Sequence, residues 1–174
     1  MRKWITAFAV LAVLVYSLIT WASPANGVTP TLLARGTYEP FKVRSAEVSP
    51  DLLPLDLDFK AEAKDPVDIV VRRHDYAPGG YTGWHTHPGP VFITVTQGSV
   101  TFYEVDDPTC APHLVTADPN DEFPATYVDT GRGHYGRNET GQTAQDMTVI
   151  IAPVGRPFRG ELFVETGINP ACGF

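Results

Sequence analysis

The sequence GGYTGWHTHPGP occupies residues 79–90 and holds two histidines, His85 and His87, that are separated by one residue. Glycine and proline on both sides of the pair prevent a long helix here and favour a short strand between turns. On an extended strand, residues two apart project from the same face. The two imidazoles can therefore meet one metal ion.

A period of two continues on both sides of this segment. From Leu55 to Lys64, apolar and charged residues alternate, which gives one dry and one wet face only in an extended chain. The 15 glycines and 16 prolines exceed average usage and argue against a helical bundle. The sequence therefore predicts an all-β fold, with further strands at Asp68–Tyr76, Tyr81–His87, Val91–Thr96, Ser99–Val105, Met147–Pro153 and Glu161–Glu165.

Length and charge limit the domain count and the partners. A chain of 174 residues supports one buried core and is short for two ordinary domains. Its 13 basic and 20 acidic residues give a net charge of -7, so we expect no nucleic-acid partner. We expect a small-molecule ligand or substrate, and the sequence leaves a homodimer open.

The first 22 residues have the composition of an export signal. Two basic residues precede an uncharged stretch, Trp4 to Trp21, and small and turn-forming residues follow it. Cleavage after Ala22 or after Ala25 fits the residues that a signal peptidase reads. The alternative is an uncleaved membrane anchor over residues 4–21, because this stretch is just long enough to span a bilayer.

Beyond the signal, we expect a linker over residues 23–32 and one domain over residues 33–174. The domain contains two cysteines, Cys110 and Cys172, which are not in a CxxC spacing. In an oxidising compartment such a pair favours a disulfide. The alternative is two free buried thiols.

Gln97 and Gly98 lie between two strand-like runs and predict a two-residue hairpin. In that register Val91 lies opposite Glu104. The carboxylate of Glu104 then points inward and needs a cation, a metal or hydrogen-bond donors. The predicted interior face consists of Val91, Ile93, Val95, Val100, Phe102 and Glu104.

The spacing around the histidine pair resembles the first motif of the cupin superfamily. That motif reads GxxxxxHxH, then three or four residues, a Glu, six residues and a Gly. Gly79, His85, His87 and Gly98 match it. The segments PGGYTGWHTHPGP and DDPTC also look like those of small exported single-domain bacterial cupins.

The second cupin motif ends in GxxHxxxN, which Gly131, His134 and Asn138 match. The proline expected two residues before the glycine is replaced by Asp129. The resemblance covers residues 68–174 and implies a double-stranded β-helix, a jelly-roll barrel. For Asn138 we expect a hydrogen-bonding role at the barrel edge.

The resemblance implies a metal site formed by His85, His87 and His134. The glutamate of the motif falls on Val91, because six residues must separate it from Gly98, so the usual carboxylate ligand is missing. Three neutral nitrogen donors can hold one divalent Fe, Mn, Ni, Cu or Zn ion and leave positions for water or substrate. The alternative is a cluster that binds nothing, although its buried imidazoles would then lack a partner.

Two further predictions concern the surroundings of this site. Because the hairpin places Glu104 opposite Val91, its carboxylate could replace the missing ligand or accept a hydrogen bond from a ligand histidine. Otherwise it lies at the barrel rim in solvent. We expect Tyr81, Trp84, Val91 and Phe102 to line the pocket, although aromatic residues at β spacing are often simply core.

Three functions fit these predictions. The first is a mononuclear metal-dependent oxygenase, such as a dioxygenase, that acts on a small organic molecule. The second is a non-enzymatic cupin that binds a small ligand or a metal. The third is a metal-dependent isomerase or lyase, which is weakened because the sequence shows no Tyr/His/Asp cluster for proton transfer. His74 and His113 are assigned structural roles, and the catalytic residues stay unassigned.

Overall fold

The computed structural model describes residues 24–44, 59–117, 125–162, 169 and 171–174. The expected signal peptide or anchor lies outside these residues. Within them every regular element is a β-strand, and no helix suited to crossing a membrane is found in this part of the chain. The all-β prediction is confirmed.

Short strands joined by glycine- and proline-containing turns follow one another along the chain. They are β1 (Asn26–Tyr38), β2 (Phe41–Arg44), β3 (Lys60–Ala63), β4 (Val67–Tyr81), β5 (His85–Thr86), β6 (Val91–Gln97), β7 (Ser99–Glu104), β8 (His113–Thr116), β9 (Thr126–Asp129), β10 (His134–Arg137), β11 (Ala144–Pro153) and β12 (Gly160–Glu161).

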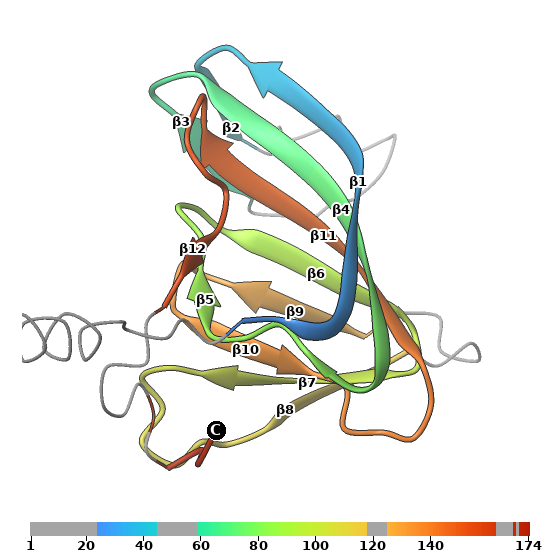
Figure 1. Cartoon of the computed structure of the whole chain (residues 1–174). Coiled ribbons are helices and arrows are strands. Elements are labelled where there is room, and N and C mark those ends of the chain that lie inside the picture. Colours follow the sequence, from blue (N-terminus) through green and yellow to red (C-terminus); the bar gives the residue numbers. More distant parts are fainter. Residues whose placement is uncertain (1–23, 45–58, 118–124, 163–168, 170) are drawn as a thin grey trace, which may run out of the picture.

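Ten of these strands form one sheet in the order β12-β5-β10-β4-β11-β6-β9, with β1 added to β4, β7 to β10, and β8 to β7. Strands β2 and β3 pair separately. The large sheet curls, so that the half containing β1, β4, β11, β6 and β9 faces the half containing β8, β7, β10, β5 and β12 (Figure 1). The halves join where Arg137 of β10 pairs with Tyr81 of β4. This is a jelly-roll barrel.

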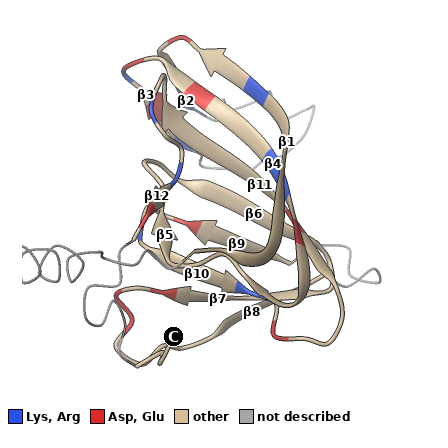
Figure 2. Cartoon of the chain, viewed as in Figure 1, with Lys and Arg blue, Asp and Glu red and all other residues tan. Residues whose placement is uncertain are grey.

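The hydrophobic core lies between the two halves. It joins Val70 and Tyr76 of β4 and Ile150 of β11 to side chains of β6, β7 and β8. Charged residues occupy a minority of the positions along the strands, and most of the ribbon is uncharged (Figure 2). The apolar members of the predicted interior face are all buried, which confirms them: Val91, Ile93, Val95, Val100 and Phe102.

The predicted hairpin at Gln97 and Gly98 was wrong. Strand β6 pairs with β11 and β9, whereas β7 pairs with β10 and β8. Gly98 has a φ of 66°, and a Cβ there would lie 2.7 Å from the carbonyl oxygen of Thr143. The glycine therefore turns the chain around a corner between the two halves instead of reversing it. Val91 pairs with Asp129, not with Glu104.

The prediction of a linker over residues 23–32 was wrong for the residues from Asn26 onward. Asn26–Tyr38 is a strand that pairs with β4 along nearly its whole length. Most of its side chains are exposed, so its sequence lacks the apolar alternation of a buried strand. Its first residues still matter for the interior, because Val28 and Pro30 line the barrel cavity.

The other predicted strands are present with shifted ends. Strands β4, β6, β7 and β11 cover the runs that begin at Asp68, Val91, Ser99 and Met147. Of the run from Tyr81 to His87, only its first residue and β5 are in strands. Strand β3 and the end of β12 represent the described parts of the runs at Leu55–Lys64 and Glu161–Glu165, and the remainder lies outside the described residues.

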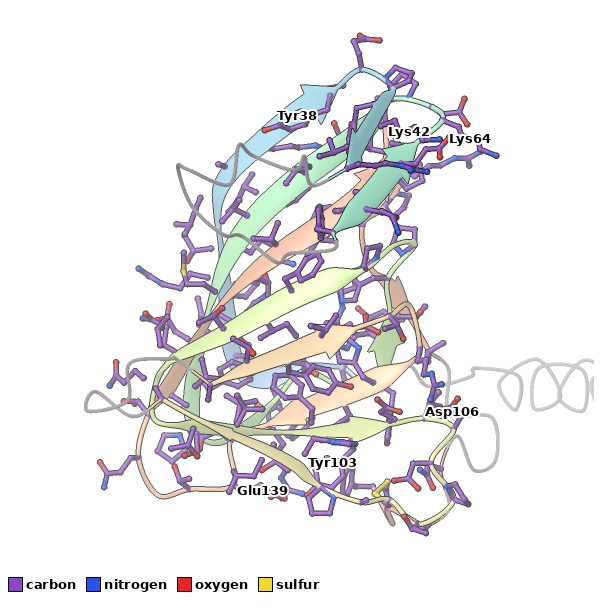
Figure 3. The ribbon with its side chains drawn as sticks, turned by 180° about the vertical axis from the view of Figure 1, so that it is seen from behind. Tyr38, Lys42, Lys64, Tyr103, Asp106 and Glu139 are labelled. Carbon is purple, nitrogen blue, oxygen red and sulfur yellow. A yellow bond between two sulfur atoms is a disulfide. The ribbon has the colours of Figure 1, made fainter. Side chains whose placement is uncertain are left out.

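A second buried cluster covers the outer side of β7 and β10. It consists of Trp84, Tyr103 and Tyr135, over which the ring of the C-terminal residue Phe174 lies. The indole nitrogen of Trp84 donates to the Phe174 backbone oxygen at 3.0 Å. The predicted disulfide between Cys110 and Cys172 is confirmed and ties this tail to the loop after β7 (Figure 3).

Removing the disulfide should destabilise the fold. The cysteines are 62 residues apart, so the chain-entropy model predicts a loss of about 4 kcal/mol in the free energy of unfolding for the Cys110→Ser/Cys172→Ser variant. Urea denaturation of this variant, and of the wild-type protein under reducing conditions, measures the loss. A loss below about 1 kcal/mol in both samples would show that the bridge does not restrain the chain.

Candidate metal centre

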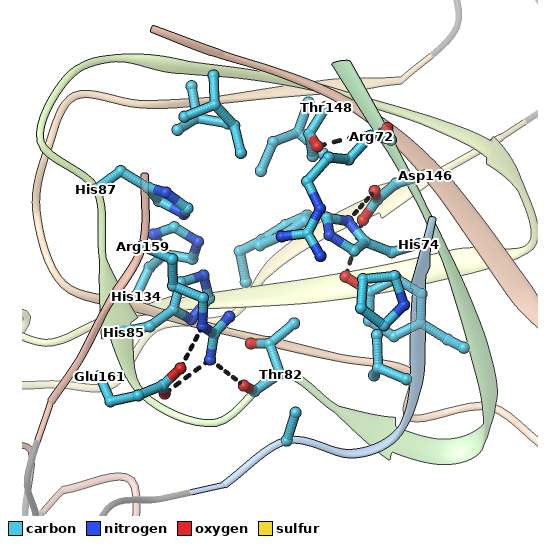
Figure 4. Close-up of a pocket in the computed structure, with 18 residues that line it drawn as sticks. Arg72, His74, Thr82, His85, His87, His134, Asp146, Thr148, Arg159 and Glu161 are labelled. Atoms are coloured by element: carbon cyan, nitrogen blue, oxygen red, sulfur yellow. Dashed lines mark hydrogen bonds and ion pairs between the residues drawn. The ribbon is translucent and has the colours of Figure 1, made fainter. Parts of the chain in front are cut away.

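The three predicted histidines meet inside the barrel (Figure 4). His85 begins β5 and pairs with His134, which begins β10, while His87 directly follows β5. The ring centroids of His85 and His134 are 4.2 Å apart, and that of His87 lies 5.0 and 5.4 Å from them. One nitrogen of each ring lies within 4.8 Å of the others. All three residues are buried, so the motif histidines form one cluster.

Backbone oxygens fix the ring orientation of two of these histidines. The Nδ1 of His85 lies 2.9 Å from the Gly83 oxygen, and the Nδ1 of His87 lies 2.6 Å from the Phe158 oxygen. Because a carbonyl oxygen only accepts, each Nδ1 must carry the proton and donate. The lone pair of each Nε2 is then left for a metal ion.

The third histidine is oriented by a carboxylate. The Nδ1 of His134 lies 3.3 Å from Oδ2 of Asp129, an ion-pair distance, and both atoms are buried with no hydrogen-bond partner in the described chain. The other oxygen of Asp129 accepts from the Gly131 amide at 2.9 Å. Burial raises the pKa of Asp129, but its contacts with His134 and Gly131 lower it by more, so the carboxyl ionises readily.

The electrostatics of the cluster favour neutral rings at His85 and His87. Burial lowers the pKa of His85 well below the ordinary value for histidine, and the neighbouring His134 lowers it further. Burial also lowers the pKa of His87 to about 4. Protons therefore compete weakly for these two rings at neutral pH. Three imidazole nitrogen donors that converge on one point fit a divalent transition metal, with positions left open for water or substrate.

The cluster opens into a cavity of about 150 Å³. Val91 and Phe102 line it, as predicted, together with Ile93 and Ile150. Its polar wall is formed by Arg72, His74, Tyr76, Asp146, Thr148, Arg159 and Glu161 (Figure 4).

No family model and no curated protein matches this sequence. Among solved structures, the polyketide cyclase RemF from Streptomyces resistomycificus is 19% identical over 88% of this chain and 85% of its own, with a TM-score of 0.50. A cupin-2 domain protein from Rhodospirillum rubrum is 13% identical over 82% and 72%, with a TM-score of 0.46. A Streptococcus pyogenes protein of unknown function is 17% identical over 49% of this chain, which spans 65% of that protein, with a TM-score of 0.39.

The jelly-roll topology of this chain is similar to that of RemF, and at 19% identity this likeness shows the fold alone. The second motif also behaves as expected at Asn138, which is fully buried and donates to the backbone oxygens of Ala77 and Gln142.

The chain departs from the cupin motif at the position of its carboxylate ligand. Val91, which stands where the motif glutamate falls, is buried in the cavity wall. Glu104 does not fill the gap by the predicted route, because the pairing behind that prediction was wrong and its carboxylate accepts from Tyr127 at 3.1 Å and Arg132 at 3.2 Å. In the described chain the group of neighbouring ligand atoms consists of histidine nitrogens. Asp129 is the carboxylate that contacts a histidine of the cluster.

Sequence reasoning missed a second polar group in the cavity. His74, assigned a structural role near the surface, points inward, and its Nδ1 lies 2.8 Å from Oδ1 of Asp146. The hydroxyl of Tyr76 donates to Oδ2 of the same carboxylate at 2.8 Å. The alternation Val70, Arg72, His74, Tyr76 along β4 was the available signal.

Two of the predicted pocket residues belong elsewhere. Tyr81, the last residue of β4, and Trp84, in the loop that follows, pack in the second cluster beneath the C-terminal tail and not in the cavity wall. His113 lies exposed on β8, away from the histidine cluster.

Replacing one histidine of the cluster should remove the metal. We expect His85→Ala to lose most of a divalent ion that the wild-type protein retains, because two imidazoles bind far more weakly than three. Elemental analysis after loading with zinc or manganese and dialysis measures the content. His113→Ala is the matched control and should retain the ion. Equal metal content in wild type and His85→Ala would place the ion elsewhere.

The two carboxylates near the site should respond differently. Asp129→Asn should weaken metal affinity by about 10- to 100-fold, because it loses the charged group that orients His134. Glu104→Gln should leave the affinity nearly unchanged, since its partners are Tyr127 and Arg132. Competition titration with a metal-sensitive dye compares both. The reverse ranking would make Glu104 the functional carboxylate.

Proposed function

We propose that this protein is a metal-dependent enzyme that moves a proton on a small organic molecule, as an isomerase or a lyase does. The observation that carries this proposal is the His74–Asp146–Tyr76 group, which lines the same cavity as the three-histidine cluster. It is the Tyr/His/Asp arrangement that the sequence alone did not reveal. The proposal therefore favours the third of the three functions considered from the sequence.

The hydrogen bonds of this group prepare His74 to accept a proton. An ionised carboxylate only accepts, so the Nδ1 of His74 donates to Asp146 and its Nε2 is left as the basic atom. Burial and the charge of Asp146 raise the pKa of Tyr76 well above its ordinary value, so its hydroxyl stays protonated and holds the carboxylate. Asp146 then stabilises the ring once it has taken up the proton.

The cluster and the cavity supply the other requirements. A divalent ion bound by the three histidines would act as a Lewis acid on a substrate oxygen and acidify a neighbouring C–H bond. A cavity of about 150 Å³ admits a molecule of about the size of benzene. The apolar wall at Ile93, Phe102 and Ile150 limits water around the reacting atoms.

A second candidate is the oxygenase predicted first from the sequence. Three histidine ligands leave several coordination positions free, which is the arrangement needed to bind an organic molecule and oxygen side by side. The proton-transfer function is preferred because an oxygenase gives the His74–Asp146 pair no necessary task.

We also propose that the protein works outside the cytoplasm. The Cys110–Cys172 disulfide supports this location, since such bonds persist in oxidising compartments. Export by the first 22 residues, or anchoring by residues 4–21, is part of the same proposal.

Proton transfer can be tested without knowing the natural substrate. The zinc- or manganese-loaded protein is incubated in D₂O with small ketones and 2-oxo acids, and NMR follows deuterium at the carbon next to the carbonyl. We expect exchange with the wild-type protein and a loss of about 10²- to 10⁴-fold in His74→Gln, which removes the base. His113→Gln should exchange normally, and all three proteins should retain the metal.

An oxygen electrode separates the alternatives. Oxygen consumption that His74→Gln leaves unchanged would contradict the proposal and support the oxygenase. If the protein binds metal but neither exchanges deuterium into nor consumes oxygen with any of the ketones and 2-oxo acids tested, the result would support a non-enzymatic binding protein.

A further inference from the structure

Strand β4 points a cationic side chain into the barrel. Arg72 lies between the buried Val70 and the inward-facing His74, so the alternation of the strand directs it to the cavity, which it lines. Its neighbour Arg73 faces the other side and forms an ion pair with Asp75 at 3.0 Å. An inward guanidinium is costly unless an anion accompanies it.

In the described chain, Arg72 has no carboxylate as an ion-pair partner. Its guanidinium carbon lies 5.1 Å from the centroid of the Phe158 ring, which is a cation–π contact. The other guanidinium in the cavity, that of Arg159, donates to the Glu161 carboxylate at 2.6 and 2.9 Å and to the backbone oxygen of Thr82 at 2.7 Å. Arg159 therefore already has a carboxylate partner, whereas Arg72 has none in the described chain.

The nearest acidic group does not serve Arg72 directly. Both oxygens of Asp146 accept hydrogen bonds from His74 and Tyr76. Burial, followed by the charge of Arg159, lowers the pKa of Arg72, whereas the charge of Asp146 has the opposite and smaller effect. Arg72 therefore has no direct acidic partner in the described chain, and an incoming anion would supply one.

We propose that Arg72 binds a carboxylate group of the substrate, and that the substrate is a small organic acid. This inference rests on the proposed function, because it uses the same cavity. In the view of Figure 4, the guanidinium of Arg72 projects between the His74 ring and the three-histidine cluster. A carboxylate held there places the rest of the molecule between the metal centre and the base.

Charge and size favour a carboxylate over a larger anion. One guanidinium fork matches one planar carboxylate through two parallel hydrogen bonds. A cavity of about 150 Å³ leaves space for a short or ring-sized carbon body beside the apolar residues Phe102 and Ile150. Phe158 beneath the guanidinium keeps the fork facing the cavity.

Matched probes can test this assignment. Benzoate and benzamide have the same shape and differ in charge, and acetate and acetamide form a smaller pair. Binding of each is measured by calorimetry and ligand-observed NMR to the full protein, both zinc-loaded and stripped of metal. We expect the metal-free wild type to prefer a carboxylate over its amide by tenfold or more.

Two arginine variants show which side chain causes the preference for a carboxylate over its amide. Arg72→Gln should abolish it, whereas Arg73→Gln, which removes the same charge from the outer face of the same strand, should keep it. Should Arg72→Gln fail to fold, the Nε–H signal of Arg72 in ¹⁵N-arginine-labelled wild type should shift with benzoate and not with benzamide. A preference that survives Arg72→Gln, one seen only with zinc, or no binding of either carboxylate at tens of millimolar would overturn the assignment.

The same experiment distinguishes this inference from the proposed function. A carboxylate preference in the metal-free protein, together with no metal retention or no proton exchange, would refute the enzyme and leave the anion site. Metal retention and proton exchange without a carboxylate preference would refute the anion site alone.

Discussion

The site depends on how the Nδ1 atoms of three buried histidines are held. Two of them donate to the backbone oxygens of Gly83 and Phe158, and the third faces the Asp129 carboxylate. These anchors come from separate loops and from the end of β9, so they converge only when both halves of the barrel are in place. Burial then keeps the rings of His85 and His87 neutral, and the cost of desolvating the cluster makes a bound cation favourable.

Periodicity predicted which side chains face inward better than which strands pair. The alternation along Val91–Gln97 and Ser99–Glu104 correctly identified the apolar residues of the interior face, because that pattern is local, but it missed Thr101 and Tyr103, which are buried on the other face of β7. Strand pairing is not local, and a left-handed glycine such as Gly98 serves a corner as well as a hairpin. The edge strand β1 was missed because most of its side chains are exposed and its sequence shows no alternation of apolar and polar residues.

The same difference explains which parts of the site could be predicted. His85, His87 and His134 were found because their spacing matches two family motifs. His74 and Asp146 are 72 residues apart and matched no motif, although the inward alternation of β4 would have placed His74 beside Tyr76. Asp129 was seen only as a departure from the motif, since nothing local links it to His134. The cavity thus combines three histidine nitrogens, His74 and the guanidinium of Arg72, which has no carboxylate partner within the described residues, and these groups come from distant parts of the chain.

The central claim is that one ion is held by three imidazoles through Nε2, with no protein carboxylate attached. A crystal structure of the zinc-loaded protein, with the metal located by its anomalous scattering, tests it most directly. The account predicts one ion per chain at about 2.0 to 2.1 Å from the Nε2 atoms of His85, His87 and His134. An ion elsewhere, coordination through Nδ1, or Glu104 in the coordination sphere would contradict it.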